Sequence, residues 1–149
     1  MGADPGDRVE HRSLDGADVQ ISYDDEPKPG EPTSFSWRGA LADSALRGTV
    51  GKETAVTLLL RKLGVSDIEV GDAEFDSEFH IISSDEEQMR SWVERPAVRE
   101  ALLAVRRRAA CIVSIWRQGF EVTGQLPDDA TVPDPQLESF CEALYRSAR

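Results

Sequence analysis

Residues 111–124 read CIVSIWRQGFEVTG, and this stretch decides the fold class. Apolar and polar residues alternate through Cys111–Trp116 and again through Phe120–Gly124, which is the period of a half-buried β-strand. Residues 117–119 join the two runs, and their glycine is available for the positive φ that tight turns use. The stretch therefore predicts a β-hairpin, and the hairpin places an antiparallel sheet in the domain.

Two helical segments precede this hairpin. Ser84 and Glu87 form a capping-box pattern ahead of apolar residues, which predicts a helix to about Glu94. Pro96 then opens a second helix, because proline is accepted in the first helical turn. Arginines at 106–108 close that helix, where positive charge suits the helix dipole. We therefore expect one broken helix before the hairpin.

The rest of the chain supplies further strands and a last helix. Period-two runs predict strands at 34–38, 46–50, 54–61 and 78–83. Residues 54–63 also match helical spacing, and their β-branched content favours a strand without excluding the helix. Asp134 and Pro135 begin a C-terminal helix. Its apolar stripe suits a helix that lies on a sheet and consists of Leu137, Phe140, Cys141, Leu144 and Ala148.

These elements predict an α+β fold with an antiparallel sheet of five to seven strands, a broken helix between strands, and a C-terminal helix packed on one face. We expect residues 33–149 to form a single domain. Residues 1–17 contain almost no apolar side chains, which predicts a flexible acidic tail. Residues 18–32 are expected to hold an edge strand, followed by a Pro-rich acidic loop.

The composition excludes some classes of partner. The 149 residues include 28 acidic and 17 basic ones, for a formal net charge of −11. Binding to nucleic acid or to an anionic membrane needs a basic surplus, so neither is expected. The N-terminus lacks the basic and apolar regions of a secretory signal. Arginine outnumbers lysine 14 to 3, and alanine is abundant. We therefore expect a bacterial, cytoplasmic protein from a GC-rich genome.

Charge is segregated along the chain. Residues 67–87 hold nine acidic residues and no basic one, whereas residues 88–117 hold seven arginines and two acidic residues. Such a division, together with tryptophans able to anchor an interface, favours protein binding. The candidate partner-binding residues are Trp92, Arg99, Arg106, Arg107, Trp116 and Arg117.

An acidic cluster is the strongest candidate for chemistry. Every second residue from Asp72 to His80 is acidic or histidine. On an extended strand Asp76, Glu78 and His80 would share one face, which suits a hard cation or an acid–base pair. Alternation of this kind is also what the wet face of a half-exposed strand requires, and we prefer that interpretation. No metal and no cofactor is expected.

The two cysteines, Cys111 and Cys141, are too few for a disulfide framework. Each lies on an apolar face of its element, and no histidine is placed to serve as a base. We expect both to be buried small hydrophobic residues. No catalytic residue is assigned.

Two resemblances bear on the fold. The pattern Asp72-x-x-Phe75-Asp76-x-x-Phe79, with the helical stretch 98–103 after it, resembles a strand and helix pair of uncharacterised bacterial α+β proteins that have no assigned activity. The element order also resembles the secretion-chaperone fold, in which three strands, a helix, a hairpin and a final helix form a small acidic dimer. This chain lacks a convincing first helix, which such chaperones use to bind their clients.

The sequence thus predicts a non-enzymatic, cytoplasmic domain that binds another protein or a neighbouring domain, as a monomer or a homodimer. Two alternatives stay open. One is an acidic dimer of the secretion-chaperone kind. The other is a metal-assisted hydrolase that uses the face of Asp76, Glu78 and His80.

Overall fold

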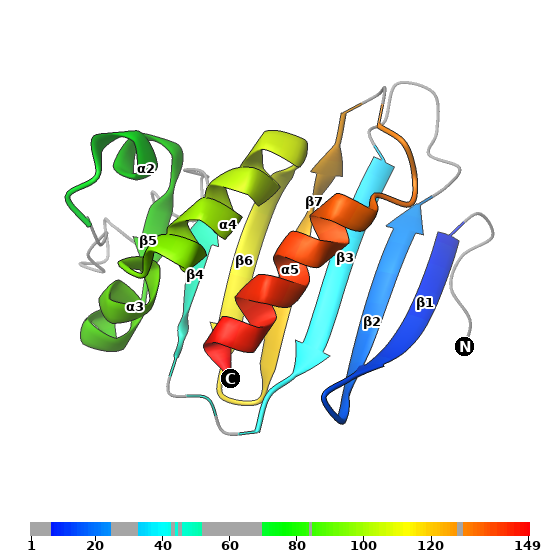
Figure 1. The fold of residues 1–149 in the computed structure, drawn as a ribbon, viewed down its shortest axis with the longest axis horizontal. Helices are drawn as coiled ribbons and strands as arrows, with labels where there is room; N and C mark the ends of the chain where they lie inside the picture. Colours follow the sequence, from blue (N-terminus) through cyan, green and yellow to red (C-terminus); the bar gives the residue numbers. More distant parts are fainter. Residues whose placement is uncertain are drawn as a thin grey trace.

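The computed structural model describes residues 7–24, 33–42, 44, 46–51, 70–83, 85–127 and 130–149. Seven antiparallel strands form one sheet in the order β1-β2-β3-β7-β6-β4-β5, with α4 and α5 lying across one face (Figure 1). The predicted α+β fold is therefore confirmed. The strands are β1 (Asp7–Leu14), β2 (Ala17–Asp24), β3 (Thr33–Ala40), β4 (Gly48–Gly51), β5 (His80–Ile82), β6 (Ala110–Trp116) and β7 (Gly119–Leu126). The described helices are α2 (Ala73–Glu78), α3 (Glu86–Val93), α4 (Pro96–Arg108) and α5 (Pro135–Ala148).

The core is a layer between the sheet and the helices. Because strand side chains alternate between the two faces, cross-strand partners form rows on one face. One buried row crosses six strands, and each of its members is at most 2% exposed. The row consists of Ile21, Trp37, Val122, Val113, Val50 and Ile81.

Tyr145 fixes the C-terminal half of α5 on this layer. Its ring centroid lies 5.2 Å from that of Trp37 and 5.7 Å from that of Phe120. A Cβ atom at Gly39 would come within 2.6 Å of the Tyr145 ring, so the glycine leaves the space that the ring occupies. The Tyr145 hydroxyl donates a hydrogen bond to the carbonyl of Ala40. The helix therefore approaches β3 closely at this point.

A buried carboxylate fixes the other half of α5. Glu138 is 4% exposed, and its oxygens accept hydrogen bonds from the Tyr23 hydroxyl at 2.5 Å and the Arg12 guanidinium at 2.7 Å. The Tyr23 hydroxyl also accepts from the backbone N–H of Asp134 at 3.1 Å. A buried charge is costly unless it is paired and hydrogen-bonded, so these contacts hold β1 and β2 against α5.

The first hairpin corrects our expectation for the N-terminus. Asp7–Leu14, expected within a flexible tail, forms β1 and pairs along its whole length with β2. Asp15 and Gly16 connect the strands with φ of 51° and 83°, and a type I′ turn requires positive φ at both central residues. Backbone pairing and the Arg12 contact thus order a segment that is poor in apolar residues.

The expected domain start at Thr33 is consequently too late. β2 lies between β1 and β3, so it is an interior strand and not the expected edge strand. Its residues Val19, Ile21 and Tyr23 are each at most 2% exposed and belong to the core. The expected acidic loop at 25–32 and the ambiguous segment 54–63 lie outside the described residues.

The strand expected at 78–83 is shorter, β5 (His80–Ile82), and the acidic residues before it, expected to be extended, form the helix α2 (Ala73–Glu78). The Asp72 side chain caps α2 by accepting from the N–H of Phe75 at 3.2 Å. The rings of Phe75 and Phe79, one helical turn apart, lie 4.8 Å from each other. The cap by Asp72 and the contact between Phe75 and Phe79 stabilise a helix here, which explains why these residues do not form the extended strand that their alternation predicted.

The helix boundaries near Pro96 and Asp134 are confirmed. Pro96 is the first residue of α4, and the Asp134 side chain caps α5 by accepting from Leu137 N–H at 3.1 Å. The cap of α3 is Asp85, whose carboxylate accepts from Gln88 N–H at 3.3 Å, and not the expected Ser84. Ser84 itself lies outside the described residues.

The Glu138 contacts predict a destabilised Tyr23→Phe variant. Removing the hydroxyl takes one hydrogen bond from a buried carboxylate and another from the Asp134 amide. The free energy of unfolding should fall by about 1–3 kcal/mol, measured by urea denaturation. As a control, Glu86→Gln breaks an exposed i, i+4 ion pair with Arg90 and should change stability by only about 0–1 kcal/mol. Equal losses in the two variants would contradict the assigned role of Tyr23.

Candidate functional site

The acidic cluster does not form the face that the hydrolase alternative requires. Asp76 lies on α2, and its carboxylate accepts from the backbone N–H groups of Val70 at 3.0 Å and Gly71 at 3.1 Å. His80 begins β5, and the side chain of Glu78 lies outside the described part of the structure. Within the described ranges no group of three or more His, Cys, Asp or Glu side chains is arranged to hold a metal ion.

Both cysteines are buried, as expected. Cys111 is 5% exposed and Cys141 is fully buried, and neither forms a disulfide. Burial raises the pKa of the Cys111 thiol to about 11 and the pKa of the Cys141 thiol well above its ordinary value. Because the thiolate is the nucleophilic form, the thiols of this core are poorly suited to covalent catalysis.

The six expected partner-binding residues do not converge. Trp92 is 1% exposed and donates from its indole N–H to Ser147 Oγ at 2.9 Å, so the expectation that it anchors an interface directly is wrong. Trp116 is 46% exposed at the end of β6, and Arg117 lies in the turn after it. The remaining three, Arg99, Arg106 and Arg107, lie on α4.

The arginine and acidic stretches partly neutralise each other. Arg99 lies 3.3 Å from the Asp72 carboxylate, and Arg107 lies 3.9 Å from Glu74. These contacts join α4 to α2. Part of the charge segregation that favoured a binding surface therefore serves an internal contact between two helices.

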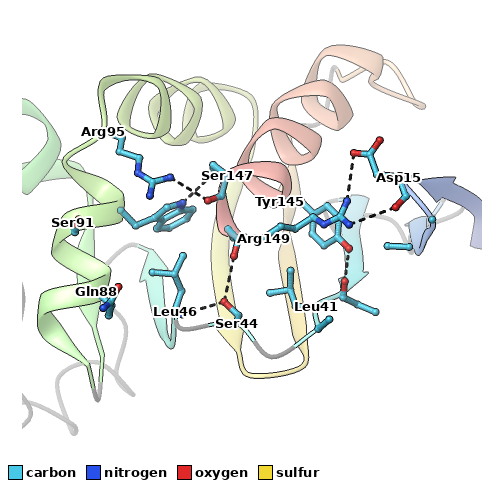
Figure 2. Close-up of a pocket in the computed structure, with 16 residues that line it drawn as sticks. Asp15, Leu41, Ser44, Leu46, Gln88, Ser91, Arg95, Tyr145, Ser147 and Arg149 are labelled. Carbon is cyan, nitrogen blue, oxygen red and sulfur yellow. Dashed lines mark hydrogen bonds and ion pairs between the residues drawn. The ribbon is translucent and has the colours of Figure 1, made fainter.

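A groove between α3 and the C-terminal end of α5 is the best candidate site, and we call it the α3–α5 groove (Figure 2). Its volume is about 690 Å³. The β1–β2 turn and the connection after β3 complete its walls, so four separate segments build it. The lining residues labelled in Figure 2 are Asp15, Leu41, Ser44, Leu46, Gln88, Ser91, Arg95, Tyr145, Ser147 and Arg149.

Hydrogen bonds fix the shape of this groove. The Ser44 hydroxyl donates to the carbonyl of Ala148 at 3.3 Å and accepts from the N–H of Leu46 at 3.1 Å (Figure 2). The indole of Trp92 lies beneath, bonded to Ser147 on α5. These contacts tie α3, α5 and the β3–β4 connection together, so the groove walls are held by the core.

Apolar side chains and guanidinium groups line the groove together. Leu41, Leu46 and Ala148 contribute apolar surface, and each keeps 5–8% of its surface exposed. Arg95 stands at one end, where it reaches the carbonyl of Ser147 at 3.4 Å. At the other end Arg149 covers the Tyr145 ring, with 5.8 Å between its guanidinium carbon and the ring centroid.

The guanidinium of Arg149, at the second end of the groove, binds a carboxylate, that of Asp15. This carboxylate lies 3.2 Å from Arg146 and 3.4 Å from Arg149, and it belongs to the turn between β1 and β2. A guanidinium carries five N–H donors, more than these contacts use. The groove therefore offers carboxylate-binding groups at its two ends and apolar surface between them.

A second cavity of about 730 Å³ lies at the opposite end of α5 and is lined by three prolines, Arg107 and Arg108. There Asp134 both caps α5 and binds Arg108 at 3.0 Å. Both arginines of this cavity are thus paired with carboxylates, Arg108 with Asp134 and Arg107 with Glu74, whereas Arg95 of the α3–α5 groove contacts a backbone carbonyl. The second cavity is therefore the weaker candidate.

Sequence reasoning found only one residue of the α3–α5 groove, Trp92, and assigned it the wrong role. The groove joins positions as distant as Asp15 and Arg149, and no local period or motif marks such a set. The arginine-rich stretch 88–117 pointed to part of the groove, because it contains Arg95.

No family model, curated protein or solved structure matches this chain. None of the helices in the described ranges is long and apolar enough to cross a membrane.

The buried cysteines predict slow thiol chemistry. In the native protein at neutral pH, a maleimide should label neither Cys111 nor Cys141 at an appreciable rate, because both thiols are enclosed and protonated. Unfolding in urea should release both for rapid labelling, which mass spectrometry can count. Rapid labelling of either thiol without urea would contradict their assignment to the core.

The raised thiol pKa values also predict alkaline destabilisation. The native state holds the Cys111 proton up to a pKa of about 11, whereas the ordinary pKa of a free thiol is 9.0. The unfolded chain therefore loses its proton first as the pH rises, and the free energy of unfolding should fall between pH 9 and pH 11. The free energy of unfolding of Cys111→Ala should fall less steeply. The remaining slope comes from Cys141, Tyr23 and Tyr145, whose pKa values are also raised by burial. An identical slope in this variant would contradict the contribution of Cys111.

Proposed function

We propose that this chain is a non-enzymatic protein-interaction domain, which holds a short segment of a partner protein in the α3–α5 groove. One observation carries the proposal: the groove combines apolar surface with guanidinium groups at its two ends. We further propose a bacterial, cytoplasmic setting, on the basis of the composition alone.

The dimensions and chemistry of the groove favour a peptide segment. Ligand sites generally enclose about 300–1,000 Å³, a range that includes this groove. Leu41 and Leu46 offer apolar contact for one or two side chains of the partner. Arg95 and Arg149 offer charge-assisted hydrogen bonds to carboxylates. The favoured segment therefore has apolar residues flanked by acidic ones.

The titratable groups of the groove support a binding role over catalysis. Within the described residues they are Asp15, Arg95, Tyr145 and Arg149. Asp15 is held by two arginines, and burial raises the pKa of the Tyr145 hydroxyl. General acid–base chemistry near neutral pH works best with a group that titrates there, and this set does not include a histidine or a cysteine.

Binding of a synthetic peptide tests the proposal. The probe is a fluorescein-labelled peptide with two central leucines flanked by glutamates, compared with a peptide in which lysines replace the glutamates. Fluorescence anisotropy should show the acidic peptide binding more tightly. Arg95→Glu should weaken that binding about tenfold or more, because it replaces attraction with repulsion.

Arg107→Glu is the matched control. It makes the same change of charge on α4, outside the α3–α5 groove, and should leave the affinity within about twofold of the wild type, because exposed charges at a distance are screened. The proposal fails if the two peptides bind equally. It also fails if Arg107→Glu weakens binding as much as Arg95→Glu, since general electrostatics or the second cavity would then explain the binding.

A further inference from the structure

The four described helices leave one face of the sheet uncovered. α4 and α5 lie on the other face (Figure 1), and α2 is joined to α4 by the ion pair between Asp72 and Arg99. α3 lies on the helix-covered side too, because Met89 is close to the Gly48 position there. We call the opposite side the open face.

Strand register defines the open face. One row crosses all seven strands next to the buried row and consists of Val9, Ser22, Ser36, Thr123, Ile112, Gly51 and His80. The next row on the same face consists of His11, Gln20, Arg38, Glu121, Ser114, Thr49 and Ile82. Half of these side chains are short, and a hollow of about 500 Å³ lined in part by Ser22, Ser36 and Thr123 lies among them.

All of the exposed large apolar side chains in the described ranges lie on the open face. They are Val9 and Ile112, each 37% exposed, and Trp116, 46% exposed. Val9 and Ile112 belong to the same row, and Trp116 follows Ile112 on β6 with the same alternation. Apolar groups gathered on one side of a soluble domain mark an interaction surface.

Gly119 allows Trp116 to lie flat on this surface. The glycine is the cross-strand partner of Trp116, and a Cβ atom there would overlap the indole ring. Its φ is not positive, contrary to the conformation we expected for this turn. The glycine is therefore explained by contact with the tryptophan and not by the turn.

The middle of the open face is close to neutral in a strongly acidic chain, and the acidic residues Asp18 and Asp24 lie on the same face toward its β1–β2 end. In its two rows the formal charges are Arg38 and Glu121, which neutralise each other at 2.6 Å across β3 and β7. The chain as a whole carries −11. Two copies of an acidic protein repel each other, and the repulsion is weakest where the surface is neutral.

We propose that the open face is a self-association surface, through which two copies of this chain pack sheet to sheet as a symmetric dimer. A two-fold axis brings the same patch of each copy together, so a surface whose middle is neutral and carries apolar groups is complementary to itself there. Sheets pack face to face at about 10 Å, a distance that short side chains such as Ser36 and Thr123 permit.

The available area fits such a dimer. With strands about 4.8 Å apart and a rise of about 3.3 Å per residue, this sheet presents roughly 700 Å² in projection. A stable interface of standard size buries about 800 Å² per partner. Arg95 and the α5 residues of the α3–α5 groove lie on other elements, so the dimer would leave that groove accessible.

Sedimentation velocity of the full chain tests the proposal over a range of concentrations from low to high micromolar. As the concentration rises, the wild-type protein should change from monomer to dimer. Ile112→Arg places two like charges within the apolar part of the interface and should raise the dissociation constant about tenfold or more. Ser36→Arg, on β3, should do the same, so the result does not depend on one variant that might fold poorly.

Ala143→Arg is the matched control, because it makes the same change of charge on the solvent-exposed side of α5. It should dimerise as the wild type does, and circular dichroism should confirm that all variants are folded. The proposal is overturned if the wild-type protein stays monomeric at every concentration. It is also overturned if folded Ile112→Arg and Ser36→Arg dimerise normally, or if Ala143→Arg dissociates the dimer equally. None of these outcomes depends on peptide binding in the α3–α5 groove.

Discussion

The rest of the structure depends on one buried carboxylate. Glu138 lies between α5 and the sheet, where an unpaired charge would be strongly destabilising, and Arg12 and Tyr23 satisfy it from β1 and β2. This requirement fixes the N-terminal end of α5 over the first hairpin. Tyr145 fixes the other end over Gly39. The position of α5 then determines which face of the sheet is covered and where the helix ends beside α3.

The two surfaces that we propose for binding follow from that position. At the C-terminal end of α5, the helix meets α3 and the β3–β4 connection and leaves the α3–α5 groove. On the other side of the sheet, no described helix covers the exposed Ile112 and Trp116 side chains. The two surfaces differ in chemistry, since the groove presents guanidinium groups whereas the middle of the open face is close to neutral. A domain of this kind could hold a partner segment and self-associate at the same time.

The errors of the sequence analysis have specific physical causes. The alternation from Asp72 to His80 fits a strand, but the same residues place Asp72 at a helix cap and stack Phe75 on Phe79 one turn later. Short apolar patterns of this kind fit two periods, and capping decides between them. The N-terminal hairpin was missed because β1 is poor in apolar residues. Its signal was Asp15-Gly16, a dipeptide that favours a type I′ turn and was present in the sequence.

The sequence by itself determined the elements whose signals are local. Alternation and a short connection predicted the β6–β7 hairpin, Pro96 marked the start of α4, and Asp134 with Pro135 marked the start of α5, because periods and caps act over a few residues. Only the tertiary structure decided the buried pairing of Glu138 with Tyr23 and Arg12, which are 115 and 126 residues away in the chain. The groove and the open face depend in the same way on strand register and helix docking. Those are set by contacts between distant segments, and a single sequence carries no local signal for them.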